Sequence, residues 1–253
     1  MNNILNDEQI ELMKVSGRIL RDSLFAVRDQ VRSGISTKEL DTIAEKEIVK
    51  RGATPSFKNY FVRGVGRYPA ALCISINDEI VHGLPDSKRK IAEGDLVSLD
   101  LGASYRGICS DMAITVCVGT PTPEIEKFLR VTEQSLYAGI SAAHSGARIG
   151  AIGNKVQTIA ESEGYGVVRD LVGHGIGAKP HLDPMIPNYG DRDEGPVIVE
   201  HMALAIEPML TLGDYEIDCD DNGWTIRTRD RSLSSHFEHT VVIIDDKPVI
   251  VTK

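Results

Sequence analysis

The sequence predicts an α+β fold, built as two halves of similar plan that pack as one domain over residues 1–253. The first observation is the order of elements: two helical patterns, a set of strand patterns, two more helical patterns and a second set of strands. The second is that no Pro-, Gly- or Ser-rich linker separates the halves. The third is the run of short strand patterns in the last third, which favours antiparallel pairing over a doubly wound sheet.

Two helices are predicted at the N-terminal end. Asn6 begins the first, with Gln9 at the spacing of a capping box, and Gly34 is expected to end it. The segment Ser-Thr-Lys-Glu at 36–39 is a second capping box, and Gly52 is the expected stop of the second helix. Apolar residues recur at helical spacing between these signals, so each helix has one face for a core.

The remaining helices and the strands follow in order. Thr122 followed by Pro123 begins the third helix, and apolar residues at helical spacing from 149 to 159 mark the fourth, which Gly164 stops. Residues 53–70 have the composition of a loop. Strand patterns cover 72–76, 80–81, 96–101, 113–118, 204–206, 215–217, 225–226, 241–244 and 249–251.

Composition is that of an ordinary globular protein and argues against two kinds of partner. Hydrophobic residues make up 42% of the chain and charged residues 26%, and the net charge is -9. An acidic chain is a poor match for DNA or for an anionic membrane surface. No apolar run approaches the roughly 18 residues of a membrane span, and no basic-then-apolar signal begins the chain. We therefore expect a cytoplasmic protein, whose four cysteines, with no Cys-x-x-Cys pair, are free thiols.

Four carboxylates lie in or beside apolar, strand-like segments. Asp100 lies within one segment, Asp111 precedes the next, Glu207 ends a third and Glu238 precedes a fourth. An unpaired carboxylate is costly to remove from water, so each needs a partner, and one or two cations are the simplest shared partner. His174 lies in a Gly-His-Gly-Ile-Gly segment, where glycine lets the backbone approach a site closely. Oxygen ligands with one imidazole suit Mn, Fe(II), Co or Zn, and two bridged metals form a hydrolytic arrangement.

Each of these residues also has a simpler explanation. An Asp or Glu beside a strand is more often a solvated strand end or half of an ion pair. His82 and His181 lie beside Gly or Pro in loops, where a histidine is usually solvated. The coincidence of four such carboxylates with His174 favours a metal site, but the spacing alone leaves both interpretations open.

Segments spread in order over nearly the whole chain resemble the type I methionine aminopeptidases. The intervals between the five candidate ligands also fit that family, and the N-terminus lacks the extensions of its longer members, as in the compact bacterial form. The matching segments are 55–58, 74–77, 82–85, 94–100, 110–111, 173–177, 206–209, 221–233 and 237–240.

The resemblance implies a pita-bread fold, in which two pseudo-symmetric α+β halves surround a curved antiparallel sheet with a dinuclear metal site at its centre. Asp111 and Glu238 would each contact both metals, and Asp100 would chelate one of them. His174 and Glu207 would complete the other. The implied cofactors are two divalent ions, drawn from Co, Mn, Fe(II) and Zn.

The implied activity is removal of the initiator methionine from nascent chains by hydrolysis of the first peptide bond. Glu207 would accept a proton from the attacking water and pass it to the leaving amine. His181 would donate to the carbonyl oxygen as negative charge develops, and His82 would contact the scissile amide nitrogen. The implied partner is the N-terminus of a nascent polypeptide near the ribosome, and the implied state is a monomer.

The chain departs from the family around the access route for substrate. The segment 59–68 is several residues longer than usual, and Pro180 stands where an aromatic residue is expected. Leu182 and Asp183 stand where acidic residues are common, and Glu200-His201 replaces a usual Pro-Gly turn. These changes leave the candidate metal ligands intact and bear on the preference for methionine.

Three residues match the apolar, partly aromatic methionine pocket of the family, namely Tyr68, Cys73 and Trp224. A plain core role explains each of them equally well. Two other functions remain open. A proline-directed or broader metalloaminopeptidase shares the fold, although such relatives usually carry an extra N-terminal domain. A non-catalytic pita-bread binding protein would be expected to have lost ligands, and all five are present.

Overall fold

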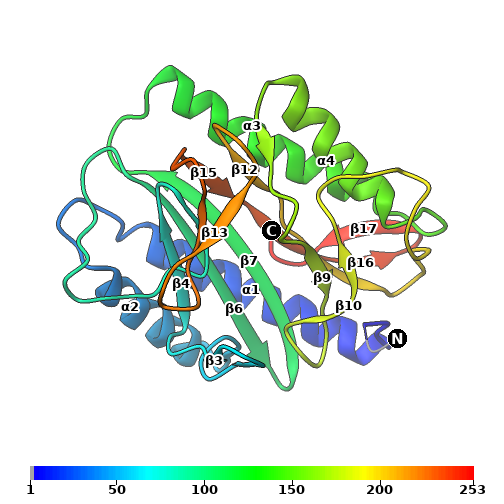
Figure 1. Cartoon of the computed structure of the whole chain (residues 1–253). Helices are drawn as coiled ribbons and strands as arrows, with labels where there is room; N and C mark the ends of the chain where they lie inside the picture. Colours follow the sequence, from blue (N-terminus) through cyan, green and yellow to red (C-terminus); the bar gives the residue numbers. More distant parts are fainter. Residues whose placement is uncertain (1–2) are drawn as a thin grey trace.

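A nine-stranded antiparallel sheet runs through the middle of the molecule, and two pairs of helices cover one of its faces (Figure 1). The computed structural model describes residues 3–253. The helices are α1 (Asp7–Arg28), α2 (Thr37–Lys50), α3 (Pro123–Ala142) and α4 (Gly150–Ser162). No helix within residues 3–253 is both long and apolar enough to cross a membrane.

The large sheet is continuous across both halves of the chain. Every strand pair in it is antiparallel, as the sequence predicts. Its order is β1 (Thr54–Pro55), β6 (Leu96–Tyr105), β7 (Ile108–Cys117), β16 (Glu238–Ile244), β11 (Ala203–Ile206), β9 (Gly173–Gly175) and β10 (Leu182–Ile186), with β4 (Leu72–Ile76) on β6 and β17 (Lys247–Ile250) on β16.

Shorter strands form three smaller sheets beside the large one. One has the order β15 (Ser234–His236), β12 (Met209–Thr211) and β8 (Gly166–Val167). Another has the order β13 (Ile217–Cys219), β14 (Ile226–Thr228) and β5 (Glu79–Val81). The third is a hairpin of β2 (Phe61–Val62) and β3 (Gly66–Arg67), within the segment that the sequence marks as unusually long.

Each helix pair packs mainly on the strands of its own half, and Ile10 and Met13 of α1 also reach β11 and β16. Leu20 and Leu24 of α1 and Leu40 of α2 share a buried cluster with β4 and β6. Leu136 of α3 and Ile152 of α4 share a second cluster with β11 and β16. The fold is therefore the α+β architecture of two similar halves that the order of elements predicts.

The predicted caps are present, and one predicted helix end is wrong. Asn6 and Ser36 each form a complete capping box, and Thr122 accepts a hydrogen bond from the backbone of Ile125. The first helix ends at Arg28, before the expected stop at Gly34. Gly34 instead has φ +86° and donates its N–H to Ile91 O at 2.8 Å, so it belongs to the loop that leads to α2.

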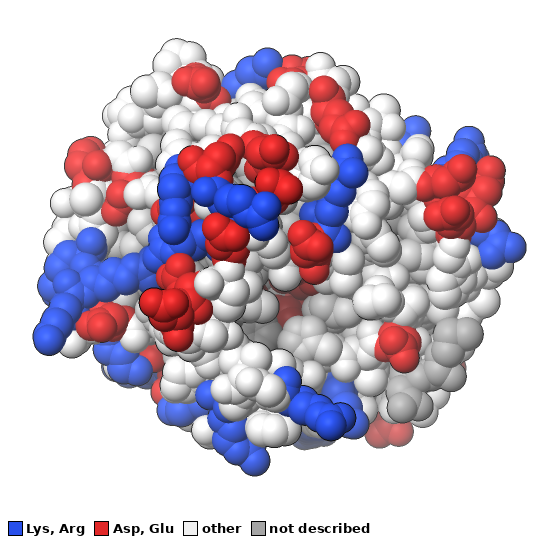
Figure 2. Space-filling model, in the orientation of Figure 1, with Lys and Arg blue, Asp and Glu red and all other residues white. Residues whose placement is uncertain are grey.

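The helices and the cavity lined by Asp111 and Glu238 lie on opposite faces of the sheet. Met112 and His239 line a hollow between α1 and α3. Their neighbours in the chain, Asp111 and Glu238, line a different cavity. Successive side chains of a strand point to opposite faces, so the cavity opens on the face that the helices leave free. Figure 2 shows that face hollowed, with acidic side chains visible inside the hollow.

Candidate metal centre and active site

The β6–β7 hairpin brings the first two candidate carboxylates together. Asp100 pairs with Ala113, and Asp111 pairs with Gly102, so the two aspartates stand two positions apart on one face. The hairpin needs a tight turn, which Arg106 and Gly107 supply with positive φ values. Both carboxylates are buried, with Asp100 8% and Asp111 2% exposed. The hairpin therefore brings both aspartates to one place on the sheet.

The second half of the chain adds three more groups to the same face. Glu238 begins β16 and lies opposite Ala113, the residue that Asp100 faces from the other side. His174, in the middle of β9, pairs with Ala205 of β11. Glu207 directly follows β11. Antiparallel register thus sets residues from both halves side by side, and this register could not be deduced from the spacing.

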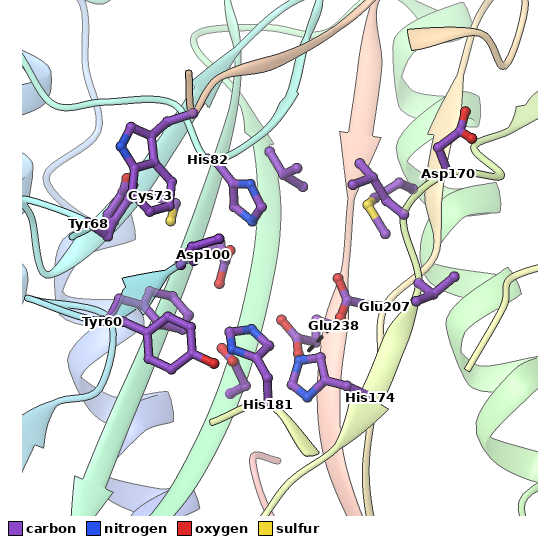
Figure 3. Close-up of a pocket in the computed structure, with 18 residues that line it drawn as sticks. Tyr60, Tyr68, Cys73, His82, Asp100, Asp170, His174, His181, Glu207 and Glu238 are labelled. Atoms are coloured by element: carbon purple, nitrogen blue, oxygen red, sulfur yellow. Dashed lines mark ion pairs between the residues drawn. The ribbon is translucent and has the colours of Figure 1, made fainter. Parts of the chain in front are cut away.

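The ligand atoms of these residues form overlapping clusters, each within 4.8 Å (Figure 3). One cluster contains Asp100, Asp111 and Glu238, and a second contains His174, Glu207 and Glu238. The two share Glu238, so the five residues offer two neighbouring positions for a cation. A third cluster joins Asp111 and His174 to His181.

Burial shifts the protonation of every carboxylate in the group. Removal from water raises the pKa of Asp100 to about 7. It also raises the pKa values of Asp111, Glu207 and Glu238 well above their usual range, and the neighbouring carboxylates add to the effect. Burial lowers the pKa of His174 to about 3, so this imidazole is neutral near pH 7 and free to act as a ligand.

Two buried carboxylate oxygens show whether these five residues fit a metal ion. Asp100 Oδ1 and Glu238 Oε1 have no hydrogen-bond partner among residues 3–253. Buried polar atoms are nearly always satisfied in folded proteins, and here a bound cation would satisfy both. Carboxylates with one neutral imidazole form a donor set suited to a divalent ion. The residues present therefore fit a metal centre.

A cavity of about 390 Å³ opens over these ligands. Its apolar end is formed by Phe57, Tyr68, Cys73 and Trp224, which belong to one buried cluster. Cys73 lies directly opposite Asp100 in the β4–β6 pair, so the apolar end adjoins the carboxylates. The rings of Tyr68 and Trp224 meet edge to face at 5.1 Å, and Tyr68 donates to Gly83 O at 3.0 Å.

The two loop histidines are found at the cavity as well. His82 follows β5 with φ +58°, and burial lowers its pKa to about 4. His181 is exposed at the mouth, and its ring lies 4.4 Å from that of His174 and 4.9 Å from that of Tyr60. Figure 3 shows both histidines directed toward the carboxylates. All ten residues singled out in the sequence line this one cavity.

One histidine near the site is not singled out in the sequence. His236 is 1% exposed, and its Nε2 lies 3.6 Å from Glu207 Oε2. Neither of its ring nitrogens has a hydrogen-bond partner among the described residues. Its place two residues before Glu238 was the available signal, because alternate residues of a strand share a face. The strand is interrupted at Phe237, where the chain passes from one sheet to another, and this break weakens the signal.

The longer segment at 59–68 borders the mouth of the cavity. It forms the β2–β3 hairpin, and Val62 lines the cavity beside Tyr60. At its tip, Val65 lies near Gly223, in the turn that precedes Trp224. The hairpin therefore spans part of the opening above the apolar end.

Comparison with known proteins gives a consistent set of relatives. Residues 11–245 match the model of metallopeptidase family M24. The methionine aminopeptidase of Clostridium perfringens is 46% identical over 247 residues, which cover 98% of this chain and 97% of that protein. The methionine aminopeptidase of Aquifex aeolicus is 44% identical over 254 residues, covering 99% of this chain and 98% of that protein.

Solved structures show the same pattern. The methionine aminopeptidase of Thermotoga maritima is 39% identical, with a TM-score of 0.95 and full coverage of both chains. The prolidase of Pyrococcus furiosus has a TM-score of 0.79 at 24% identity, and the match covers all of this chain and 66% of the prolidase. The prolidase shares the fold but differs in length and sequence.

Proposed function

The chain belongs to metallopeptidase family M24, and from that membership we propose that it hydrolyses the first peptide bond of polypeptides that begin with methionine. The observation that carries the proposal is the convergence of three buried carboxylates, the partly buried Glu207 and His174 beside an apolar recess in one cavity. The carboxylates provide a place for divalent metal and the recess a place for an apolar side chain. Methionine aminopeptidases that match this chain over nearly its whole length support methionine as the substrate residue.

Two divalent ions would be held by the five ligands. Asp111 and Glu238 would contact both, Asp100 would hold one, and His174 and Glu207 would complete the other. The overlap of the two ligand clusters at Glu238 supports this division. Divalent ions bound here would lower the pKa of a bound water and polarise the peptide carbonyl. The candidate ions are Co, Mn, Fe(II) and Zn, which the oxygen-rich ligand set accommodates.

Glu207 is suited to move the proton in this reaction. Its carboxylate accepts the proton of the attacking water and passes it to the leaving amine. In the metal-free protein, burial raises the pKa of Glu207, and a buried carboxylate beside the attacking water is placed to take its proton. His174 Nε2 lies 3.4 Å from Glu207 Oε1, close enough for both residues to hold the same ion.

The two loop histidines act on the substrate. His181, at the mouth, donates to the carbonyl oxygen as charge builds on it. His82, on the opposite side of Asp100 in Figure 3, contacts the scissile amide nitrogen and steadies the leaving group. The methionine side chain fills the recess formed by Tyr68, Cys73 and Trp224, together with Phe57.

The substrate in the cell would be the N-terminus of a nascent polypeptide, met in the cytoplasm near the ribosome. The chain would act there as a monomer, with residues 1–253 forming one catalytic domain. The continuous nine-stranded sheet supports a single domain, since it joins ligands from both halves. A proline-directed or broader metalloaminopeptidase is the second candidate, because the β2–β3 hairpin alters the mouth of the cavity.

Metal content after purification tests the ligand assignment. We expect the wild-type protein to hold divalent metal, and the His174→Ala variant to hold less and to lose turnover while remaining folded by circular dichroism. His144→Ala is the matched control, because His144 is exposed and lies outside the cavity. A folded His174→Ala variant with wild-type turnover would refute the assignment.

A further inference from the structure

Strand β16 changes its neighbour part-way along one edge. Glu238 and His239 pair with β7, whereas the residues from Val241 to Ile244 pair with β17. Thr240 lies between these two stretches, where β7 and β17 part. Two candidate ligands border this point, Glu238 on β16 and Asp111 on β7.

The side chain of Thr240 takes the place of a backbone pair at the gap. Its Oγ1 accepts from Asp111 N at 2.8 Å and donates to Asp111 O at 2.8 Å. One hydroxyl thus satisfies both main-chain groups of Asp111 that face β16. The link holds the backbone of one candidate ligand against the strand that carries another.

The last residues of the chain complete the junction from the other side. Thr252 is fully buried, and its Oγ1 accepts from Thr240 N at 3.2 Å. The same hydroxyl lies 2.8 Å from Nδ1 of His239, the residue that follows Glu238. Val251 N donates to Thr240 O at 3.0 Å. The N–H and C=O of Thr240 therefore bind residues 251 and 252, and not β7 or the paired residues of β17.

Helix α1 holds this chain end in place. Arg21 Nη1 donates to Lys253 O at 2.7 Å. Gly17 packs directly on the carbonyl of Val251, so closely that a Cβ atom there would lie 2.1 Å from the oxygen. The tail from 251 to 253 is thus fixed between the helix and the sheet, behind the ligands.

We propose that Thr252 is a positioning residue for the metal centre, acting through Thr240 on Asp111 and through His239 on Glu238. The inference rests on the proposed function, because it takes these two carboxylates to be metal ligands. Residues that orient metal ligands typically change metal affinity about 10- to 100-fold when they are removed. The hydroxyl of Thr252 contacts Thr240 and His239 at one point, without touching a candidate ligand, the metal or the substrate.

Substitutions that differ only in the hydroxyl test the proposal. Thr252→Val keeps the shape and removes the hydroxyl, whereas Thr252→Ser keeps the hydroxyl. The matched control is Thr132→Val in α3, since Thr132 is also fully buried and its hydroxyl donates to Phe128 O at 2.9 Å, away from the ligands. The measurements are Co(II) affinity by calorimetry on metal-stripped protein, and the visible absorption spectrum of the Co(II)-loaded protein, which reports ligand geometry.

We expect Thr252→Val to weaken Co(II) binding by about tenfold or more and to alter the Co(II) spectrum. Thr252→Ser and Thr132→Val should match the wild type in both measurements. Wild-type affinity and spectrum in Thr252→Val would overturn the inference alone. Failure of the wild-type protein to bind Co(II) would instead overturn the ligand assignment, and this inference with it.

If Thr252→Val does not fold, hydrogen exchange on the wild-type protein provides a second test of the proposal. Metal binding should slow exchange of the Thr240 and Val251 amides more than that of the Thr132 amide. These two amides are the ones that join the tail to β16. Equal exchange with and without metal at Thr240 and Val251 would contradict the proposal.

Discussion

At the scale of single residues, Glu207 lies between two buried histidines. His174 Nε2 is 3.4 Å from one of its carboxylate oxygens, and His236 Nε2 is 3.6 Å from the other. Burial lowers the pKa of each histidine to about 3, so neither carries a positive charge near pH 7. No positively charged side chain therefore neighbours Glu207, and burial raises the pKa of its carboxyl in the metal-free protein.

Glu207→Gln keeps the shape of the side chain and removes its ability to carry a proton. We expect kcat for a methionine peptide to fall by about 10²- to 10⁴-fold, the usual contribution of general acid–base catalysis. Steady-state kinetics at saturating metal would measure the change, with His144→Ala as the control. A Glu207→Gln variant within tenfold of wild-type kcat would show that another group moves the proton.

Most residues of the candidate site could be predicted from the sequence, and those that could not were missed for a physical reason. Asp100 and Asp111 lie eleven residues apart on two adjacent strand patterns, so a hairpin was enough to bring them together. Tyr68 and Trp224 were recognised only through resemblance. The contact of His236 with Glu207 and the role of Thr252 depend on strand register between distant segments, which local periodicity does not encode.

At the scale of elements, the β2–β3 hairpin is the part of the cavity wall that the longer 59–68 segment supplies. Val62 lines the cavity, and the tip of the hairpin lies near Gly223 on the other rim. We expect Val62→Ala to make room for a bulkier second residue, and so to raise the rate on Met-Leu-Ser relative to Met-Ala-Ser. A pocket contact of this size is worth about tenfold in discrimination.

The comparison of kcat/KM for the two peptides would measure the effect of Val62→Ala. Val49→Ala is the control, because Val49 is 57% exposed on α2, which packs on the other face of the sheet. Metal affinity should be the same in both variants. An unchanged ratio of rates in Val62→Ala would mean that the hairpin has no part in substrate choice.

Helix α1 packs so closely on the backbone of Val251 that position 17 has room only for glycine. A Cβ on Gly17 would lie 2.1 Å from Val251 O, a backbone atom that cannot move aside alone. We expect Gly17→Ala to destabilise the protein by about 1–3 kcal/mol, the usual cost of overpacking. Urea denaturation would measure it against Arg18→Ala, at an exposed position of the same helix. Equal stability of the two variants would contradict the packing described here.

The long elements were predictable from the sequence and the short strands were not. Asn6 and Ser36 mark their helices because a capping box is a local structure. Strands such as β8 and β12 contain only two or three residues and exist because a neighbouring strand pairs with them. The end of α1 was misplaced for a related reason: Gly34 resembles a helix stop, but its bond to Ile91 is a tertiary contact.

At the scale of the whole molecule, the buried carboxylates couple stability to pH in the metal-free protein. The pKa of Asp100 rises from 3.8 to about 7 on folding, so its contribution is present at low pH and is lost as pH rises through 7. The pKa of His174 falls from 6.5 to about 3, so its contribution acts in the opposite direction, but only below pH 6.5. Above pH 6.5 the carboxylates alone remain.

We therefore expect the free energy of unfolding of metal-stripped protein to fall between pH 6.5 and pH 8. Urea denaturation at the two pH values would measure it. Asp100→Asn should show a smaller fall, because it has no proton to lose, and added Mn(II) should reduce the fall in the wild type by binding the deprotonated form. Stability that rises over this range would contradict the burial of the carboxylates.

The overall architecture followed from the order of helices and strands, because each helix pair needs a sheet face to cover. The continuity of the sheet across the halves did not follow. It depends on β7 pairing with β16, a contact between residues more than one hundred positions apart. That pairing is what gathers Asp111 and Glu238 into one site.

The most direct test of metal-dependent methionine release is the initial rate on three peptides, Met-Ala-Ser, Leu-Ala-Ser and Ala-Pro-Ser. The enzyme would be stripped of metal and refilled in turn with Mn, Fe(II), Co or Zn. We predict cleavage of the methionine peptide alone, and only with metal. Cleavage of the leucine or proline peptide would reassign the substrate, whereas folded protein that cleaves none of them with any metal would contradict the account.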